Sequence, residues 1–166
     1  MIALQVLDIK LFMKQLLIGH NFDRFNISEG TITTFCSFSI DGAWQRDFLD
    51  PDHENVLLDR EYTPWKNVRE FCFSLIKGKR TPIAFKFVFM LPEEDIPHFL
   101  TSEGILVEPE EIYGLFLNFT YRDKKLLVTT GTSRRTFTMD RSIDNAWDLY
   151  VHSFLRNNGI ATEQIQ

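Results

Sequence analysis

The sequence predicts an α+β fold, in which helices pack on a mainly antiparallel sheet. Several short segments alternate apolar and polar residues, as half-buried strands do, and most are joined by turns too short for a crossover helix. Three longer segments carry apolar residues at helical spacing instead. At 166 residues and without a linker, the chain suits one domain over residues 1–160, followed by a frayed tail over residues 161–166.

The expected elements follow the order β-α-β-β-β, helix, β, short helix, two or three β, helix. Their bounds are strand 2–6, helix 8–18, strands 22–27, 31–40 and 43–49, helix 63–77, strand 83–91, short helix 92–100, strands 113–122, 126–130 and 134–139, and helix 142–158.

Capping and turn residues define the elements of the N-terminal part. Asp8 is a good N-cap for the first helix, and Gly19 ends that helix. Ser28–Gly30 is expected to turn one strand into the next as a hairpin, and Asp41–Gly42 is a second turn signal.

The helix over 63–77 and the strand after it form the centre of the predicted fold. Thr63 caps the helix, and Pro64 fits its first turn, where a missing amide proton has no effect. Gly78 ends the helix, and Pro82 is tolerated at the start of the strand. The residues expected on the core-facing side of the helix are Trp65, Val68, Phe71, Cys72, Leu75 and Ile76.

The C-terminal part is expected to add strands and a last helix. Pro97 interrupts the short helix over 92–100, and Gly131 marks a bend between two strands. The last helix places an apolar side toward the core and ends at Gly159.

Composition favours a cytoplasmic protein without a membrane span. No apolar run approaches the roughly 18 residues of a spanning helix. Asp8, Lys10 and Lys14 interrupt the apolar N-terminal segment, which argues against a signal peptide. Cys36 and Cys72 are expected to be buried thiols, and 16 phenylalanines predict an aromatic core. The net charge of −5 gives no overall basic field.

No catalytic spacing is found, and we expect neither a cofactor nor a metal. The chain lacks a glycine-rich phosphate loop, a G-x-S-x-G elbow and the H-E-x-x-H and C-x-x-C motifs. Asp50–Glu54 offers oxygen ligands and one imidazole, without the glycine and spacing of a calcium loop. We interpret it as part of a solvated loop over 49–61, in which residues 55–58 could form a short edge strand.

One polar segment near the predicted last helix offers groups to an anion. Thr132 and Ser133 supply hydroxyls, and Arg134 and Arg135 supply guanidinium groups. The alternative interpretation is a threonine-rich strand end that binds nothing.

The densest positive charge lies around the helix over 63–77. Cations on a helix face and the following turn can follow a phosphate backbone, and Phe73 among them can stack on a base or dock a partner. The alternative is a solvated face whose C-terminal cations complement the helix dipole. Together with two lysines of the first helix, these cations are Lys10, Lys14, Lys66, Arg69, Lys77, Lys79 and Arg80.

Two runs, Thr31–Gly42 (TITTFCSFSIDG) and Cys72–Phe89 (CFSLIKGKRTPIAFKFVF), resemble an uncharacterised bacterial protein family. That family has no assigned function, so this resemblance implies no activity.

The order of elements over residues 1–139 resembles one domain of a DNA sliding clamp, and Phe25–Phe48 is similar in pattern to the clamp hairpin after the first helix. In clamps the helices carry lysines and arginines toward DNA phosphates. The last helix is extra, and one domain would act only by self-assembly or as a partner module. The resemblance implies phosphate contacts for Lys10, Lys14, Lys66, Arg69 and Lys77.

These observations predict a non-enzymatic binding module, clamp-like in form, with a basic helical face for DNA or an acidic protein partner. One alternative is a protein-interaction or structural domain, for example a homo-oligomer, without a nucleic-acid role. Another is a small-ligand protein or enzyme that uses residues 129–135 or an aromatic pocket. The direction of the face formed by Lys66, Arg69 and Lys77 should separate these functions.

Overall fold

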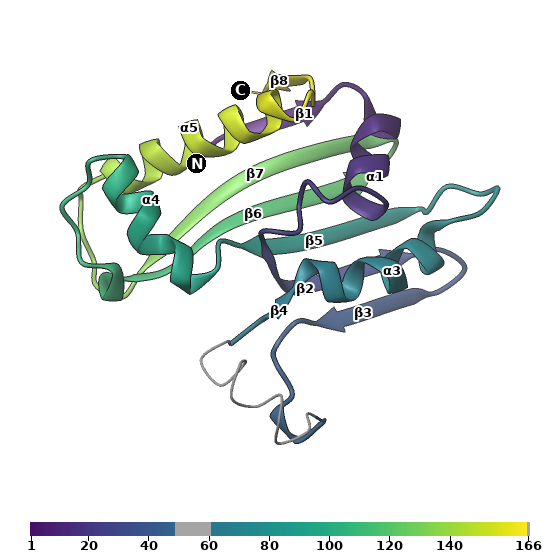
Figure 1. Ribbon diagram of the computed structural model, residues 1–166. Coiled ribbons are helices and arrows are strands. Elements are labelled where there is room, and N and C mark those ends of the chain that lie inside the picture. The colour runs from purple at the N-terminus through teal and green to yellow at the C-terminus, as the bar shows by residue number, and fades with distance from the viewer. Residues whose placement is uncertain (49–60, 166) are drawn as a thin grey trace.

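The computed structural model describes residues 1–48 and 61–165 and shows an α+β fold built on one antiparallel sheet (Figure 1). Across the sheet the strands follow the order β3-β2-β5-β6-β7-β1-β8, and β4 pairs with β2 beyond the end of β3. The strands are β1 (Ala3–Val6), β2 (Asn26–Thr33), β3 (Ser37–Asp41), β4 (Thr63–Pro64), β5 (Ala84–Met90), β6 (Ile112–Arg122), β7 (Lys125–Arg134) and β8 (Thr162–Gln164).

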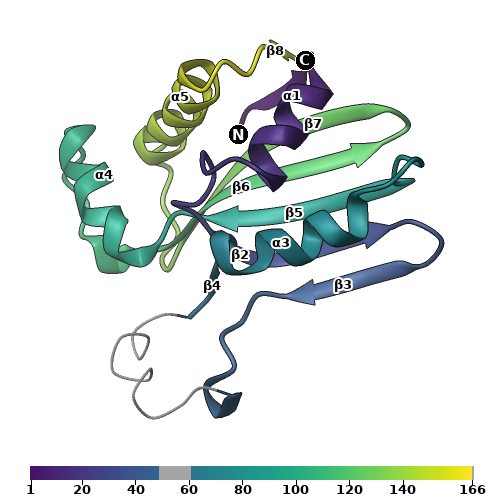
Figure 2. The same ribbon diagram turned by 45° about the vertical axis from the view of Figure 1, so that its right-hand side comes forward.

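Helices pack on one face of this sheet (Figures 1 and 2). Phe12 of α1 packs on Phe119 of β6, and Trp65 of α3 packs on Phe87 of β5. α5 lies along β7, and α4 joins it where Phe99 meets Trp147. The helices are α1 (Ile9–Leu17), α3 (Trp65–Ile76), α4 (Ile96–Ser102) and α5 (Ser142–Asn157), with 3₁₀ turns η1 (Arg46–Phe48), η2 (Glu93–Asp95) and η3 (Pro109–Glu111).

The opposite face of the sheet is largely polar. Cross-strand register places Thr31, Lys86, Thr120, Leu127 and Gln5 in one row across five strands. All five side chains are exposed or half-buried. Within the described residues this face therefore meets solvent.

Phenylalanine forms the centre of the core, as the composition predicts. The rings of Phe12, Phe22, Phe89 and Phe119 form one cluster, in which the centroids of neighbouring rings lie 5.1 to 6.3 Å apart, mostly edge to face. Such pairs add stabilisation beyond the area that they bury. The alternating strand predicted around Phe89 is confirmed as β5.

The first hairpin differs from the predicted one, because β2 runs straight through Ser28–Gly30. The chain turns at Thr34–Cys36 instead, where the Thr34 amide donates to the Cys36 carbonyl oxygen (2.9 Å). A Cβ at Gly30 would lie 3.0 Å from the ring of Phe87. Glycine is needed there for close packing within the sheet and not for a turn.

The two cysteines lie in different surroundings. Cys72 lies on the core-facing side of α3 and is fully buried, as predicted. Burial raises the pKa of its thiol to about 12. Cys36 is exposed in the hairpin turn, so the prediction of a buried thiol is wrong at this position.

Three further elements differ from the sequence-based expectation. Residues 43–49 were expected to form a strand, but Ala43 forms only an isolated bridge with Tyr62, and η1 follows. Thr63 and Pro64 belong to β4, so α3 begins one residue later and has no side-chain cap. The expected strand over 134–139 is absent, because β7 runs through Gly131 and ends at Arg134.

The chain end pairs with the sheet. The tail over 161–166 was expected to fray, whereas Thr162–Gln164 form β8 beside β1. The Ile165 amide also donates to the Ala3 carbonyl oxygen (2.9 Å).

Phe71 does not face the core, in contrast to the expectation from helical periodicity. Its side chain is 72% exposed, whereas Trp65 and Cys72 are fully buried. Phe71 is rotated by about 120° from Trp65 around the helix axis, because each residue advances by about 100°. The buried arc of α3 is turned toward α1, so Phe71 lies on the side of β3.

Two sequence-based expectations concern residues that the structure does not describe. The candidate ligands Asp50–Glu54 and the edge strand over 55–58 both lie outside the described residues. Among the described helices, none has the length and apolar character needed to span a membrane.

Candidate functional site

Helices α1 and α3 are in contact on the helical face of the sheet, and their axes are inclined steeply to each other (Figures 1 and 2). Arg69 of α3 connects them, because its Nη1 donates to the Gly19 carbonyl oxygen (2.8 Å) and forms an ion pair with Asp23. The indole nitrogen of Trp65 donates to the Leu16 carbonyl oxygen (3.0 Å). The first half of α3 is therefore joined to the C-terminal end of α1.

The two flanks of α1 face different neighbours. On one flank, Gln15 Nε2 donates to the Asn158 carbonyl oxygen (2.8 Å) at the end of α5. On the other, Ile9 and Met13 line a cavity together with Ile76 at the end of α3. Five positions before Gln15, Lys10 is rotated away from the α5 side, and Lys14 follows it one turn later. Lys10 therefore lies on the outer shoulder of the flank that faces α3, whereas Lys14, one residue before Gln15 and one after Met13, points outward between the two flanks.

On α3, Lys66, Phe73 and Lys77 belong to the same helical stripe as Arg69, because they are separated by three or four residues. Arg69 points toward α1, so this stripe borders α1 as well. We call the space between these two flanks the α1–α3 groove. Helical spacing places Lys10 on its α1 side, with Lys14 on the outer crest of α1. It places Lys66 and Phe73 on the α3 side, followed by Lys77 just after the end of α3.

The groove has an apolar floor at the end where α3 stops. A cavity of about 210 Å³ lies there, and Gly78, Thr81 and Pro82 contribute to its rim. Lys79 and Arg80 lie in the turn after α3, at the mouth of this cavity. The apolar side chains of its floor are Ile9, Met13, Ile76, Phe85 and Tyr121.

The cations of the groove differ in how they are paired. Arg69 has a side chain only 12% exposed and is neutralised by Asp23. Lys66 and Lys77 are exposed, and Lys77 Nζ lies 5.9 Å from the ring centroid of Phe73. Within residues 1–48 and 61–165, no carboxylate forms an ion pair with any of the groove's exposed cations, which are Lys10, Lys14, Lys66, Lys77, Lys79 and Arg80.

The predicted basic set is thus partly brought together. Its exposed lysines line the groove, whereas Arg69 joins two helices and Phe73 packs half-buried against the core. Sequence reasoning did not find Asp23 and Gly19, which hold Arg69. Their separation from Arg69 along the chain leaves no local pattern that could reveal them.

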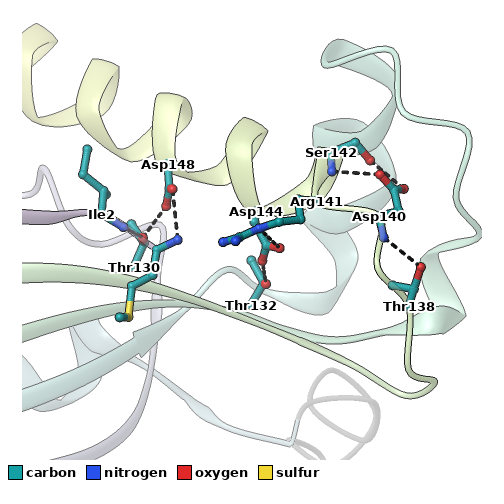
Figure 3. Close-up of polar contacts among 10 residues, drawn as sticks. Ile2, Thr130, Thr132, Thr138, Asp140, Arg141, Ser142, Asp144 and Asp148 are labelled. Atoms are coloured by element: carbon teal, nitrogen blue, oxygen red, sulfur yellow. Dashed lines mark hydrogen bonds and ion pairs between the residues drawn. The ribbon is translucent and has the colours of Figure 1, made fainter.

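The predicted anion segment lies where β7 meets α5 (Figure 3). The hydroxyl of Thr132 donates to Asp144, which also lies 3.8 Å from Arg141 Nε. One turn later, the hydroxyl of Thr130 donates to Asp148, and Asp148 also pairs with the amino group of Met1 (3.2 Å). The two threonine–aspartate contacts attach α5 to the sheet.

The arginines of this segment also contact groups of the chain itself. Arg134 Nη2 pairs with Glu111 Oε2 (3.0 Å), and the guanidinium of Arg135 lies over the ring of Tyr113 (5.6 Å). Two buried nitrogens of Arg134, Nε and Nη1, have no acceptor among the described residues. Thr132, Ser133, Arg134 and Arg135 line one open cavity of about 470 Å³, in which Asp144 takes the Thr132 hydroxyl and Glu111 takes one nitrogen of Arg134.

A tyrosine pair near β4 was not expected from the sequence. A hydrogen bond with Tyr113, together with burial, raises the pKa of Tyr62 to about 12. The cavity beside the two rings measures only about 40 Å³, so it suits a water molecule and not a substrate. No group of three or more metal-ligating side chains occurs among the described residues.

The open antiparallel sheet with helices on one face makes this an α+β protein. Residues 15–163 match the model of a family of unknown function, DUF5721, and the chain belongs to this family. The predicted membership of an uncharacterised family is confirmed. No curated protein and no solved structure matches the chain, so the comparisons lend no support to the clamp resemblance.

Proposed function

We propose that the protein is a binding module that holds a nucleic-acid backbone in the α1–α3 groove. The observation that supports this proposal is that exposed lysines of two helices in contact border one groove and form no ion pair with a described residue. Lys10 and Lys14 belong to α1, Lys66 belongs to α3, and Lys77 follows directly after α3; all four side chains are exposed.

A phosphate backbone fits this arrangement for two reasons. It carries evenly spaced negative charges, and lysines follow such charges as flexible point cations. Lys79 and Arg80 extend the positive charge beyond the end of α3, so the cations cover the length of the groove and its mouth. The contacts would go to phosphates and not to base edges, so we expect little dependence on base sequence.

The negative net charge of the chain does not oppose this function. Attraction at a surface depends on local potential, which salt screens within about 10 Å at moderate ionic strength. The acidic turns η2 and η3 flank α4, away from the groove (Figure 2). Beside the groove, Asp23 is paired with Arg69, and Glu70 lies exposed on the α3 stripe among the lysines. A locally basic groove can therefore bind a polyanion on a chain with a net charge of −5.

The test measures binding of a labelled DNA duplex by fluorescence anisotropy over a range of salt concentrations. We expect the affinity to fall with rising salt, with a log–log slope of about −0.9 per phosphate neutralised. The groove variant replaces Lys10, Lys14, Lys66 and Lys77 with glutamine. It should bind at least about tenfold more weakly at low salt and show a shallower slope.

A second variant serves as a control for net charge. It replaces four exposed cations outside the groove, Lys86, Lys125, Arg141 and Arg156, with glutamine and so removes the same four charges. This variant should keep most of the affinity of the parent. The proposal is wrong if the parent does not bind at low salt, or if both variants lose affinity equally.

A further inference from the structure

We infer that two copies of this chain pair through the outer edge of β3, so that their sheets join into one continuous antiparallel sheet. This inference concerns the opposite side of α3 from the groove and does not depend on the proposed function. It rests on a strand edge that pairs with no described residue, on apolar side chains beside it, and on the symmetry of the strand.

The edge of β3 that points away from β2 carries free backbone groups. Thr34 donates to the Cys36 carbonyl oxygen (2.9 Å), and Gly42 donates to the Ser28 carbonyl oxygen (2.8 Å). These two hydrogen bonds mark the two ends of the β2–β3 ladder. Between them, cross-strand pairs that are hydrogen-bonded to each other alternate with pairs that are not, as in any antiparallel ladder. Phe38 and Ile40 therefore bond to β2, whereas the amides and carbonyls of the residues between them point outward.

The outward groups belong to Ser37, Ser39 and Asp41, and no described residue pairs with this edge of β3. Natural edge strands are usually protected by a lysine, a proline or a bulge. β3 contains no lysine, proline or bulge, and its one charged residue, Asp41, is the last of the strand. The edge is thus open to a further strand.

Apolar side chains line the helical side of the same edge. Phe35 is 92% exposed, and its ring meets that of Phe38 edge to face with centroids 6.0 Å apart. Phe38 and Ile40 are half-buried, and their partners on β2 place them on the helical face. Phe71 on α3 lies opposite Arg69 around the helix and is 72% exposed. Phe35 and Phe38 therefore touch at the hairpin turn, Ile40 follows on the same face of β3, and Phe71 adds an exposed ring on the β3 side of α3.

A second copy of the chain is the occupant that this edge fits. A two-fold axis through Ser39 pairs Ser39 with itself in a hydrogen-bonded pair and places Phe38 opposite Ile40 of the other copy. Such an interface is self-complementary, as a two-fold contact requires. Phe35 and Phe71 are largely exposed, so a contact through this edge would remove both rings from water in each copy, in addition to pairing the outward backbone groups.

The geometry of a continuous sheet also fixes the orientation of the copies. A two-fold axis perpendicular to the sheet keeps the helices of both copies on the same face, with the two α3 helices flanking the axis. Both α1–α3 grooves would then open on one side of the dimer. A dimer would therefore present twice the cationic surface on one face.

The first test measures the molar mass in solution by sedimentation over a range of concentrations. The parent should show the mass of two chains at high concentration. Ser39→Pro removes an outward amide and leaves the ladder with β2 intact, so this variant should stay a monomer with an unchanged circular dichroism spectrum. Ser39→Ala keeps the amide and should dimerise like the parent.

A second test locates the two-fold axis, and it does not depend on whether Ser39→Pro folds. All variants carry Cys36→Ser to remove the exposed thiol. Under mild oxidation Ser39→Cys should form a disulfide-linked dimer, because residues directly opposite in a hydrogen-bonded pair have Cα atoms about 5.5 Å apart, within disulfide reach. Ser37→Cys should not, since its copies would lie far from the axis. A monomeric parent at all concentrations, or equal cross-linking of the two cysteine variants, would overturn the inference.

Discussion

Arg69 and Lys66 lie three residues apart on one stripe of α3, yet their charges act differently. The guanidinium of Arg69 is largely buried between two helices, where it bonds Gly19 and Asp23. Lys66 is exposed and has no ion pair among the described residues. Sequence spacing places both residues on one stripe. Their roles differ because the end of α1 lies against Arg69, which it buries, and leaves Lys66 exposed.

This difference predicts unequal effects on stability. Arg69→Met leaves the Asp23 carboxylate, itself only 22% exposed, with His20 Nδ1 at 2.9 Å as its remaining partner. The loss of a charged, partly buried hydrogen bond should lower the free energy of unfolding by about 1–3 kcal/mol. The matched Lys66→Met change should stay within about 0.5 kcal/mol. Urea unfolding followed by circular dichroism measures both, and equal midpoints would contradict the structural role of Arg69.

At the scale of elements, Gly42 joins β2, β3 and β4. Its amide donates to the Ser28 carbonyl oxygen (2.8 Å), and its carbonyl oxygen accepts from the Thr63 amide (2.8 Å). A Cβ at this position would clash with the carbonyl oxygen of Ile27. The sequence indicates a turn at Asp41–Gly42, whereas the structure requires glycine there because two backbones approach closely.

Gly42→Ala should therefore destabilise the protein by roughly 3 kcal/mol, because β2 must move away and weaken both hydrogen bonds. Gly131→Ala is the matched control in β7, where a Cβ would come no closer than 3.8 Å to the Cβ of Phe116. That change should be neutral or slightly stabilising. Thermal unfolding of the two variants measures the difference. Similar melting temperatures would show that the junction around Gly42 relaxes easily.

The sequence predicts the elements with strong periodicity and misses those that depend on distant partners. Helices α1, α3 and α5 and strands β5 and β6 follow from apolar spacing and agree to within a few residues. Ser28–Gly30 resembles a turn locally, but pairing with β3 and β5 keeps it in a strand. β8 forms only because β1, at the other end of the chain, offers a free edge. For the groove, the sequence shows which lysines are present on each helix. It does not show that they face the same space, because this depends on how α1 and α3 pack.

At the scale of the whole molecule, the aromatic contacts link both ends of the sheet into one core. Trp65 on α3 lies 4.9 Å from Phe89, and Phe89 contacts Phe22 at 6.3 Å between centroids. Phe22 in turn meets Phe154 on α5 at 5.5 Å. These contacts connect α3 to α5 through Phe89 and Phe22. If either helix unfolded, it would expose these shared core rings to water. The expectation of one domain over residues 1–160 therefore predicts cooperative unfolding.

Two tryptophans allow this cooperativity to be measured, because Trp65 and Trp147 are fully buried on different helices. One variant, Trp44→Phe with Trp147→Phe, retains Trp65 as the reporter. The other, Trp44→Phe with Trp65→Phe, retains Trp147. Within each variant, the urea midpoint from fluorescence should equal that from far-ultraviolet circular dichroism, although the variants differ in stability. If the Trp147 signal changes before the circular dichroism signal, α5 and its strands unfold as a separate unit, and the molecule has two cores where the contacts indicate one.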